Sequence, residues 1–209
     1  MPKKVFEEGI FPKRFKTSLE GVDVHVVYGV FWVDKNEETP VNVMCDRAGI
    51  AVHGKSYAYT EYVHFYDHEE HKRLVLEQEL EKEMEKALAE KQFYIVIQPK
   101  YDPNMECIVG GETLVRWQHP IKGFMSPGDF IPVFEKNGFI IQLDYFVWEE
   151  TCRLISKRKQ EGKKNVPISV NVSRAHFYGS ELKNKLNELV EKYDLDTKDL
   201  ELEITESLC

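Results

Sequence analysis

In the second half of the chain, short runs in which apolar residues alternate with polar ones are separated by longer runs of helical period. The segments 93–99, 107–117, 168–173 and 200–206 are rich in β-branched and aromatic residues, which predicts strands. The stretches 129–136, 143–161 and 182–193 repeat apolar residues every three to four positions, which predicts helices. The pattern of strands and helices is that of an α/β protein.

The first two of these strands are separated by a short turn. Asp102-Pro103-Asn104 carries residues that turns favour, so strands 93–99 and 107–117 are expected to be antiparallel. The later strands each follow a helix, as in a β/α barrel. We therefore expect part of a TIM-like (β/α) barrel with an antiparallel first strand pair, and functional side chains at the carboxyl ends of its strands.

Two charged residues interrupt the apolar strand 107–117. Glu112 and Arg116 are four residues apart, so in a strand their side chains point to the same face. Burying either charge without a partner is costly. A metal ion for Glu112 and a phosphate for Arg116 would satisfy both charges, and so would a Glu–Arg ion pair on a solvated face. The spacing alone leaves both interpretations open.

Oxygen donors near the ends of the later strands favour the metal interpretation. Asn171 lies in the polar end of strand 168–173, and Glu203 lies in the last part of strand 200–206. Together with Glu112 they form a set of oxygen ligands. Such a set suits Mg²⁺ or Mn²⁺ better than zinc, because zinc prefers cysteine and histidine.

Composition limits the partners of the protein. Its 209 residues are 42% hydrophobic and 31% charged, which is typical of a soluble globular protein. No apolar run approaches the roughly 20 residues of a membrane span. The N-terminus lacks the apolar core of a signal peptide, and the four cysteines form no CxxC pair, so we expect reduced thiols and a cytoplasmic location. The formal net charge of −8 argues against a polymeric nucleic acid, but not against a small nucleotide held through divalent cations.

The first third of the chain is organised differently. Residues 1–66 are expected to form a first unit, with a β-rich run at 24–33, a helix from 42 to about 56 and a closing strand at 62–66. Residues 67–92 repeat leucine and methionine at helical spacing among glutamates and lysines, which predicts a linker helix packed on one side. A short dimerising coiled coil is the alternative for this helix.

Residues 93–209 resemble the EAL family, which are bacterial phosphodiesterases that hydrolyse cyclic di-GMP. The signature tripeptide reads Glu-Thr-Leu instead of Glu-Ala-Leu, and it keeps the glutamate. The motifs that carry the resemblance, in order, are Gln98-Pro99, Glu112-Thr113-Leu114-Val115-Arg116-Trp117-Gln118-His119-Pro120, Ser126-Pro127-Gly128-Asp129-Phe130-Ile131-Pro132, Asn171-Val172-Ser173 and Glu203-Ile204-Thr205-Glu206.

This resemblance implies a role for each motif residue. Two metal ions in the family activate a water and stabilise charge on the phosphate. Glu112, Asn171 and Glu203 would be the catalytic metal ligands in this chain, with Mg²⁺ or Mn²⁺ as cofactor. Arg116 would hold a phosphate and Gln98 would meet a guanine edge. The remaining motif residue, Glu206, would brace a neighbouring loop.

The resemblance covers about half of an EAL barrel. The family's next motif, an Asp-Asp pair followed by Phe-Gly, does not occur in this sequence. We therefore expect a fragment of a longer cyclic di-GMP signalling protein, inactive by itself and associating with itself or with the remainder of the parent chain. The rival hypothesis is a non-catalytic EAL domain that acts as a cyclic di-GMP receptor or as a protein-interaction module.

Residues 1–66 resemble, more distantly, the C-terminal part of a degenerate GGDEF (diguanylate cyclase) domain. The resemblance rests on the order strand, loop, helix, strand and on Cys45-Asp46-Arg47-Ala48. Gly110-Gly111-Glu112 imitates the cyclase signature, but no phenylalanine follows and the sequence continues as the apolar strand. Diguanylate cyclase activity is therefore not expected.

Overall fold

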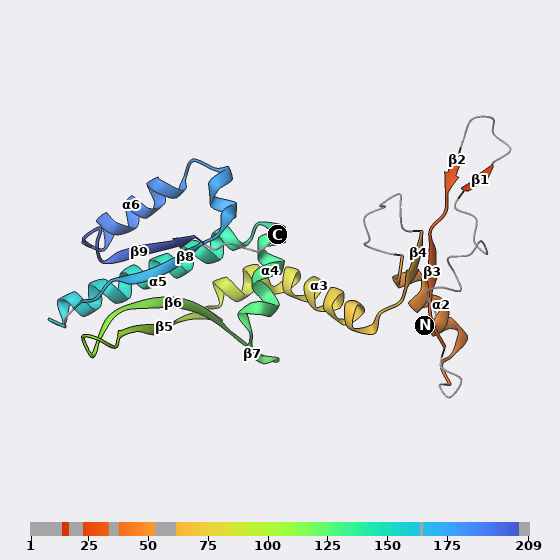
Figure 1. The fold of residues 1–209 in the computed structure, drawn as a ribbon, viewed down its shortest axis with the longest axis horizontal. Helices are drawn as coiled ribbons and strands as arrows, with labels where there is room; N and C mark the ends of the chain where they lie inside the picture. The colour runs from red at the N-terminus through yellow and green to blue at the C-terminus, as the bar shows by residue number, and fades with distance from the viewer. Residues whose placement is uncertain (1–13, 17–22, 34–37, 53–61, 164, 205–209) are drawn as a thin grey trace. The chain divides into compact units, whose positions relative to one another are not determined.

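The chain divides into two units, and the boundary between them falls inside one continuous helix. The computed structural model describes residues 14–16, 23–33, 38–52, 62–163 and 165–204. Its contacts separate Met1–Leu76 from Glu77–Cys209, and α3 (His68–Ala89) runs across the boundary (Figure 1). None of the helices in these described ranges is long and apolar enough to cross a membrane.

The described part of the first unit contains two small sheets. β1 (Arg14–Lys16) pairs antiparallel with β2 (Asp23–His25), while β3 (Tyr28–Val30) pairs parallel with β4 (Val63–Phe65). The single strand predicted over 24–33 is therefore wrong. The run is divided because β2 pairs with β1 whereas β3 pairs with β4, so the two strands belong to different sheets.

Helix α2 (Val41–Ile50) connects β3 to β4 and packs closely on β3. A Cβ at Gly29 would lie 1.8 Å from the carbonyl oxygen of Ala48, so only glycine permits this contact. The helix predicted from 42 to about 56 is confirmed as far as residue 50, and residues 53–56 lie outside the described ranges.

The second unit is built on a mixed sheet of order β5-β6-β8-β9. Its strands are β5 (Phe93–Asp102), β6 (Cys107–His119), β8 (Ile168–Val172) and β9 (Leu200–Ile204), with β7 (Gly123–Met125) pairing to the far end of β6. β5 and β6 are antiparallel, as predicted, whereas β6–β8 and β8–β9 are parallel. In the described residues β5 and β9 are the outer strands, so the sheet is open.

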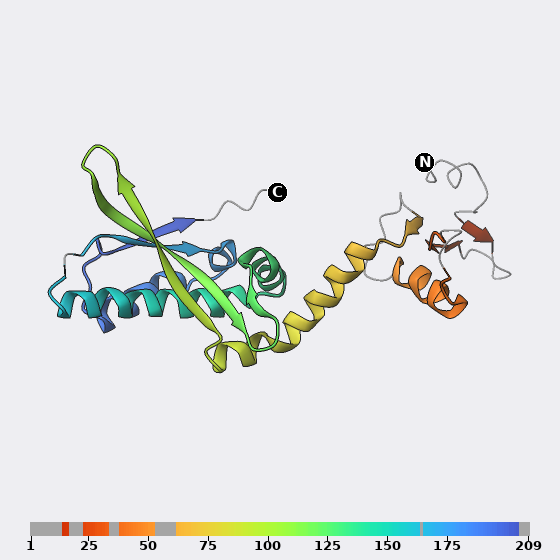
Figure 2. The same ribbon diagram turned by 90° about the horizontal axis from the view of Figure 1, so that it is seen from below.

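One face of this sheet is covered by helix. α5 (Ile140–Gln160) runs along it, and α6 (Leu182–Lys192) packs against α5 (Figure 2). Val170 and Val172 of β8 alternate inward and meet Trp148 and Cys152 of α5 in a buried cluster. The predicted helices at 143–161 and 182–193 are thus confirmed, and their apolar stripes form the core.

A second cluster is aromatic and joins the sheet to α4 (Pro127–Asn137). Phe93 and Trp117 face each other across β5 and β6 at 4.8 Å between ring centroids, and Phe130 and Phe134 of α4 lie on both rings. All four side chains are buried. This cluster fixes the position of α4 beside β6, which carries the signature motif.

The C-terminal half of α3 packs on the second unit through one side, as predicted for the linker helix. Leu80 and Ala87 are buried. Glu83 bonds the buried His119 of the signature motif at 2.6 Å, and Glu79 pairs with Lys122. Because Nδ1 of His119 accepts the backbone N–H groups of residues 121 and 122, its Nε2 carries the proton donated to Glu83.

Candidate functional site

The predicted site residues lie on the sheet face opposite the helices. Glu112 stands opposite Gln98 on β5 and beside Ser169 on β8, while Asn171 stands beside Glu203 on β9. Side chains of alternate residues share a face, so the motifs of four strands meet here. Glu206 and the rest of its segment lie outside the described residues.

Glu112 is tied to the next predicted ligand. The side-chain amide of Asn171 donates to Glu112 Oε1 at 3.1 Å, and the backbone carbonyl of Asn171 accepts from Trp148 Nε1 at 3.0 Å. Arg116 donates instead to the carbonyl of Val115 at 2.8 Å. No contact of the described residues joins Glu112 to Arg116, so the ion-pair interpretation of this spacing is wrong. Along the strand, Glu112 and Arg116 are far enough apart that Glu112 contacts Asn171 and Arg116 contacts the carbonyl of Val115.

Lys100 is a site residue that sequence reasoning missed. Its ammonium lies 2.5 Å from Glu203 Oε1 and donates to Ser169 Oγ at 2.9 Å. The hydrogen bond from Lys100 lowers the pKa of Glu203, with Ser169 adding to the effect, and the same bond raises the pKa of Lys100. The available signal was the alternation that places Lys100 on the face of Gln98. Its partners Ser169 and Glu203 lie two and three strands further along the sheet, which alternation cannot show.

The donor set fits a hard divalent cation. Two carboxylates and an amide oxygen are the ligands that Mg²⁺ and Mn²⁺ prefer, and the sheet register brings them to one face. In the described part of the chain no group of three His, Cys, Asp or Glu side chains is close enough to hold a metal by itself. Glu112, Asn171 and Glu203 would therefore need further oxygen ligands, such as water, to complete about six.

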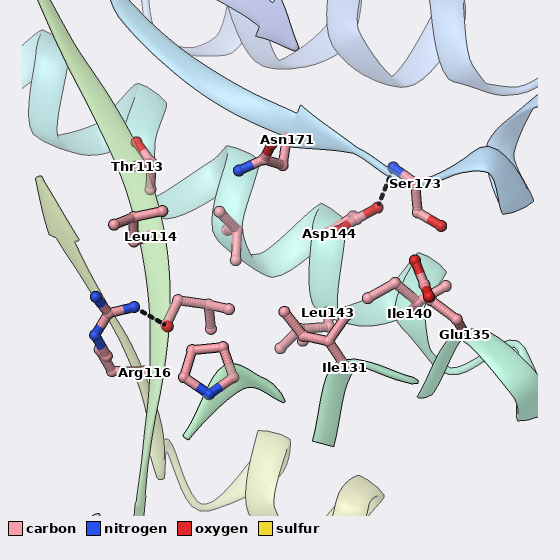
Figure 3. Close-up of a pocket in the computed structure, with 13 residues that line it drawn as sticks. Thr113, Leu114, Arg116, Ile131, Glu135, Ile140, Leu143, Asp144, Asn171 and Ser173 are labelled. Carbon is pink, nitrogen blue, oxygen red and sulfur yellow. Dashed lines mark hydrogen bonds between the residues drawn. The ribbon is translucent and has the colours of Figure 1, made fainter. Parts of the chain in front are cut away.

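A pocket adjoins this face where β6 and β8 separate. The two strands pair only through Gly111–Ile168 and Glu112–Ser169, and beyond these pairs a pocket of about 160 Å³ opens between β6, α4, α5 and the end of β8. Figure 3 shows Ile131, Ile140 and Leu143 gathered on its helical side. Its volume is below the roughly 300–1,000 Å³ of most ligand pockets.

A buried acid holds the segment that follows Asn171. Asp144 of α5 accepts hydrogen bonds from the backbone N–H of Ser173 at 3.1 Å, drawn in Figure 3, and from His176 Nε2 at 3.0 Å. Burial raises the pKa of Asp144, although both hydrogen bonds oppose the shift. His176 lies in the 3₁₀ helix η1 (Arg174–Tyr178) and packs on Trp148, the donor to Asn171. This network therefore positions a predicted ligand.

The departure from the family tripeptide lies on the other side of the strand. Thr113 is buried, and its hydroxyl is bonded to that of Thr151 on α5 at 3.1 Å. Gly110 and Gly111 lie within β6, not in a turn, and a Cβ at Gly111 would stand 2.6 Å from a methyl of Ile97. Close packing in a strand is the reason for this glycine pair.

These features define an α/β protein with oxygen-bearing side chains of several strands on the open face of a mixed sheet. The EAL domain family model matches residues 81–209, and the chain belongs to this family. The chain is similar to MucR of Pseudomonas aeruginosa, named a bifunctional diguanylate cyclase/cyclic di-GMP phosphodiesterase, at 33% identity over 60% of this chain and 18% of that protein. It is 36% identical over 57% of its length to the cyclic di-GMP phosphodiesterase PA2567 of the same species, covering 20% of that protein.

The fold is similar to solved EAL structures. A MucR phosphodiesterase in complex with c-di-GMP has a TM-score of 0.59 at 32% identity, covering 62% of this chain and 52% of that one. The EAL enzyme Bd1971, in a cGMP-bound form, has a TM-score of 0.57 at 28% identity over 65% of this chain and 39% of that one. The chain thus spans about half of the solved MucR chain and about a fifth of the curated relatives' length.

Proposed function

We propose that this chain supplies the first part of a cyclic di-GMP phosphodiesterase site, which opens one phosphodiester bond of the cyclic dinucleotide. The observation that carries the proposal is the meeting of Gln98, Glu112, Asn171 and Glu203 on one sheet face, in a chain of the EAL family. The relatives named as cyclic di-GMP phosphodiesterases and the MucR complex with c-di-GMP support it.

Each residue has a defined part in this proposal. Glu112, Asn171 and Glu203 would hold Mg²⁺ or Mn²⁺, and a bound metal would supply Lewis-acid chemistry for the phosphate and for water. Arg116 releases its hydrogen bond to the Val115 carbonyl and binds a phosphate oxygen pair through its planar fork. Gln98, which is exposed opposite Glu112, binds a guanine edge through its amide. Trp148 and Asp144 fix the strand end that carries Asn171.

The region before the EAL domain belongs to the same proposal. We infer that residues 1–66 are the C-terminal remnant of a degenerate GGDEF domain and that 67–92 link it to the EAL part at 93–209. The parallel pair β3–β4 around α2 agrees with the order of elements on which this resemblance rests. The alignment with the cyclic di-GMP phosphodiesterase NbdA of P. aeruginosa, 28% identical over 171 residues, is longer than the EAL match and supports a shared upstream region.

The test compares a metal ligand with a phosphate ligand in the 209-residue chain and, for turnover, in the longer parent chain that the proposal implies. Glu112→Gln keeps the size of the side chain but removes the charge that a divalent ion needs, so it should abolish turnover and weaken Mn²⁺ binding. Arg116→Lys keeps charge but loses the two-pronged contact. It should leave Mn²⁺ binding unchanged and weaken binding of the dinucleotide by about 1–3 kcal/mol. Calorimetry with Mn²⁺, and with dinucleotide in the presence of Ca²⁺, measures both.

Matched controls are Glu81→Gln on the exposed side of α3 and Arg153→Lys on α5, which should behave like the parent. We expect negligible turnover from the 209-residue chain by itself, because its three described donors do not complete the shells of two cations. Dinucleotide binding without turnover in that parent chain would instead favour the receptor hypothesis. Normal metal binding and turnover in Glu112→Gln would refute the proposed site.

A further inference from the structure

Lys100 reaches across the sheet to a predicted metal ligand. It lies on β5, whereas Ser169 lies on β8, beyond β6, and Glu203 lies on β9, beyond both β6 and β8. The contact joins residues 103 positions apart in sequence. It therefore depends wholly on the order of strands in the sheet.

Gly110 makes room for this crossing. Gly110 is the register partner of Lys100 on β6, and a Cβ there would lie 3.6 Å and 3.8 Å from Cδ and Cβ of the lysine stem. The same Cβ would be 3.1 Å from the carbonyl oxygen of Pro167, which is tighter than ordinary contact. The lysine stem thus lies beside a position of β6 that has no side chain. A β-bulge follows directly, between Lys100 and Tyr101.

The ammonium lies in an acidic surrounding. Besides its bond to Glu203, Lys100 is within electrostatic reach of the carboxylates of Glu201 and Glu112. Its side chain and that of Glu203 are 39% and 40% exposed, so water and ions can enter the site. A divalent cation that binds Glu203 would stand close to this ammonium, and the two positive charges would repel.

We propose that Lys100 is an internal counter-cation of Glu203 that lowers the affinity of the site for divalent metal. The metal then competes with a lysine of the protein for one of its ligands. Lys100 acts through Glu203 and is a positioning residue, not a catalytic one. The inference rests on the proposed metal site and adds to it a residue that sets how much free metal the site needs.

The experiment measures Mn²⁺ binding to the 209-residue chain by calorimetry at low ionic strength. Lys100→Met and Lys100→Gln remove the charge and should tighten Mn²⁺ binding about tenfold, the size of one nearby charge in a solvated site. Lys100→Arg keeps the charge and should bind like the parent. Lys122→Met removes the same charge from the ion pair with Glu79, away from the site, and should also bind like the parent. The gain should shrink as salt is added.

The outcomes separate this inference from the proposed function. Glu112→Gln is measured alongside: loss of Mn²⁺ binding in that variant supports the metal site whatever Lys100 does. If the neutral Lys100 variants bind Mn²⁺ as the parent does, or more weakly, Lys100 only supports the structure and the inference is overturned. If the parent binds no measurable Mn²⁺, the inference requires that Lys100→Met bind it. Absence of binding in both overturns the inference together with the metal site.

Discussion

The two faces of the β5-β6-β8-β9 sheet differ sharply although they share the same backbone. On the face covered by α4 and α5, side chains such as Trp117, Val170 and Val172 are buried and make apolar contacts. On the other face Glu112 and Lys100 are partly exposed and make charged or polar contacts. The difference shows that one strand can supply buried residues to the core and polar residues to the site, because successive side chains point to opposite faces.

Adjacent residues of the signature motif show the separation most directly. Glu112 bonds Asn171 across the open face, whereas Thr113 bonds Thr151 beneath it. A change at position 113 is therefore a packing change, while a change at 112 alters the site. This explains how the chain departs from the family tripeptide and keeps its oxygen donors. The following predictions test how completely the two faces are independent.

The largest effect is expected on the covered face. Phe134→Ala should destabilise the second unit by about 3–5 kcal/mol, because Phe134 is fully buried among Phe93, Trp117, Phe130 and Phe139 and leaves a cavity. Chemical denaturation monitored by tryptophan fluorescence measures it. Phe124→Ala, at a phenylalanine that is 58% exposed on β7, is the control and should change stability by less than about 0.5 kcal/mol. Equal losses for the two variants would contradict the assigned core.

An intermediate effect on stability is expected at Asp144, which lies on the helical side of the sheet and accepts hydrogen bonds from Ser173 and His176. Since burial raises the pKa of Asp144 in the folded protein, its contribution to stability is present below the ordinary pKa of 3.8 and is lost as pH rises through the folded value. Asp144→Asn keeps an oxygen acceptor and cannot ionise. The parent should therefore lose stability relative to this variant as pH rises above about 4, by at most about 1.4 kcal/mol per pH unit for one proton.

Thermal denaturation between pH 3 and pH 7 (roughly the range over which carboxylates titrate) would measure this difference. Asp196→Asn, at a largely exposed acid that pairs with Lys159, serves as the comparison. A pH profile for Asp144→Asn parallel to that of the parent would show that Asp144 is not held in a desolvated environment.

The smallest effect is expected where the chain departs from the family tripeptide. Thr113→Ala removes one hydroxyl, but Thr151 keeps its bond to the carbonyl of Val147. The loss should be at most about 1 kcal/mol, typical of one hydrogen bond. Mn²⁺ affinity should not change, because position 113 faces away from Glu112. A change in Mn²⁺ affinity in this variant would show that the two faces are coupled through β6.

Much of the architecture could be predicted because it depends on local pattern. The antiparallel hairpin, the helices α4, α5 and α6, and the strands β8 and β9 follow from apolar periodicity and turn residues. The β-rich run at 24–33 contains two strands instead of one, and the pattern cannot show that β2 and β3 pair in different sheets. The short strand β7 and the 3₁₀ helix η1 escaped prediction because neither is long enough to show a period.

The sequence by itself determined which residues share the open face: alternation places Glu112 and Arg116 together, and likewise Ser169 with Asn171. Only the tertiary structure decided what these residues contact. Strand order brought Lys100 to Glu203 over Gly110, and the packing of α5 brought Asp144 to His176 and Ser173. The physical reason is that such contacts join residues tens of positions apart, and their geometry follows from strand pairing and helix docking, which no local pattern records.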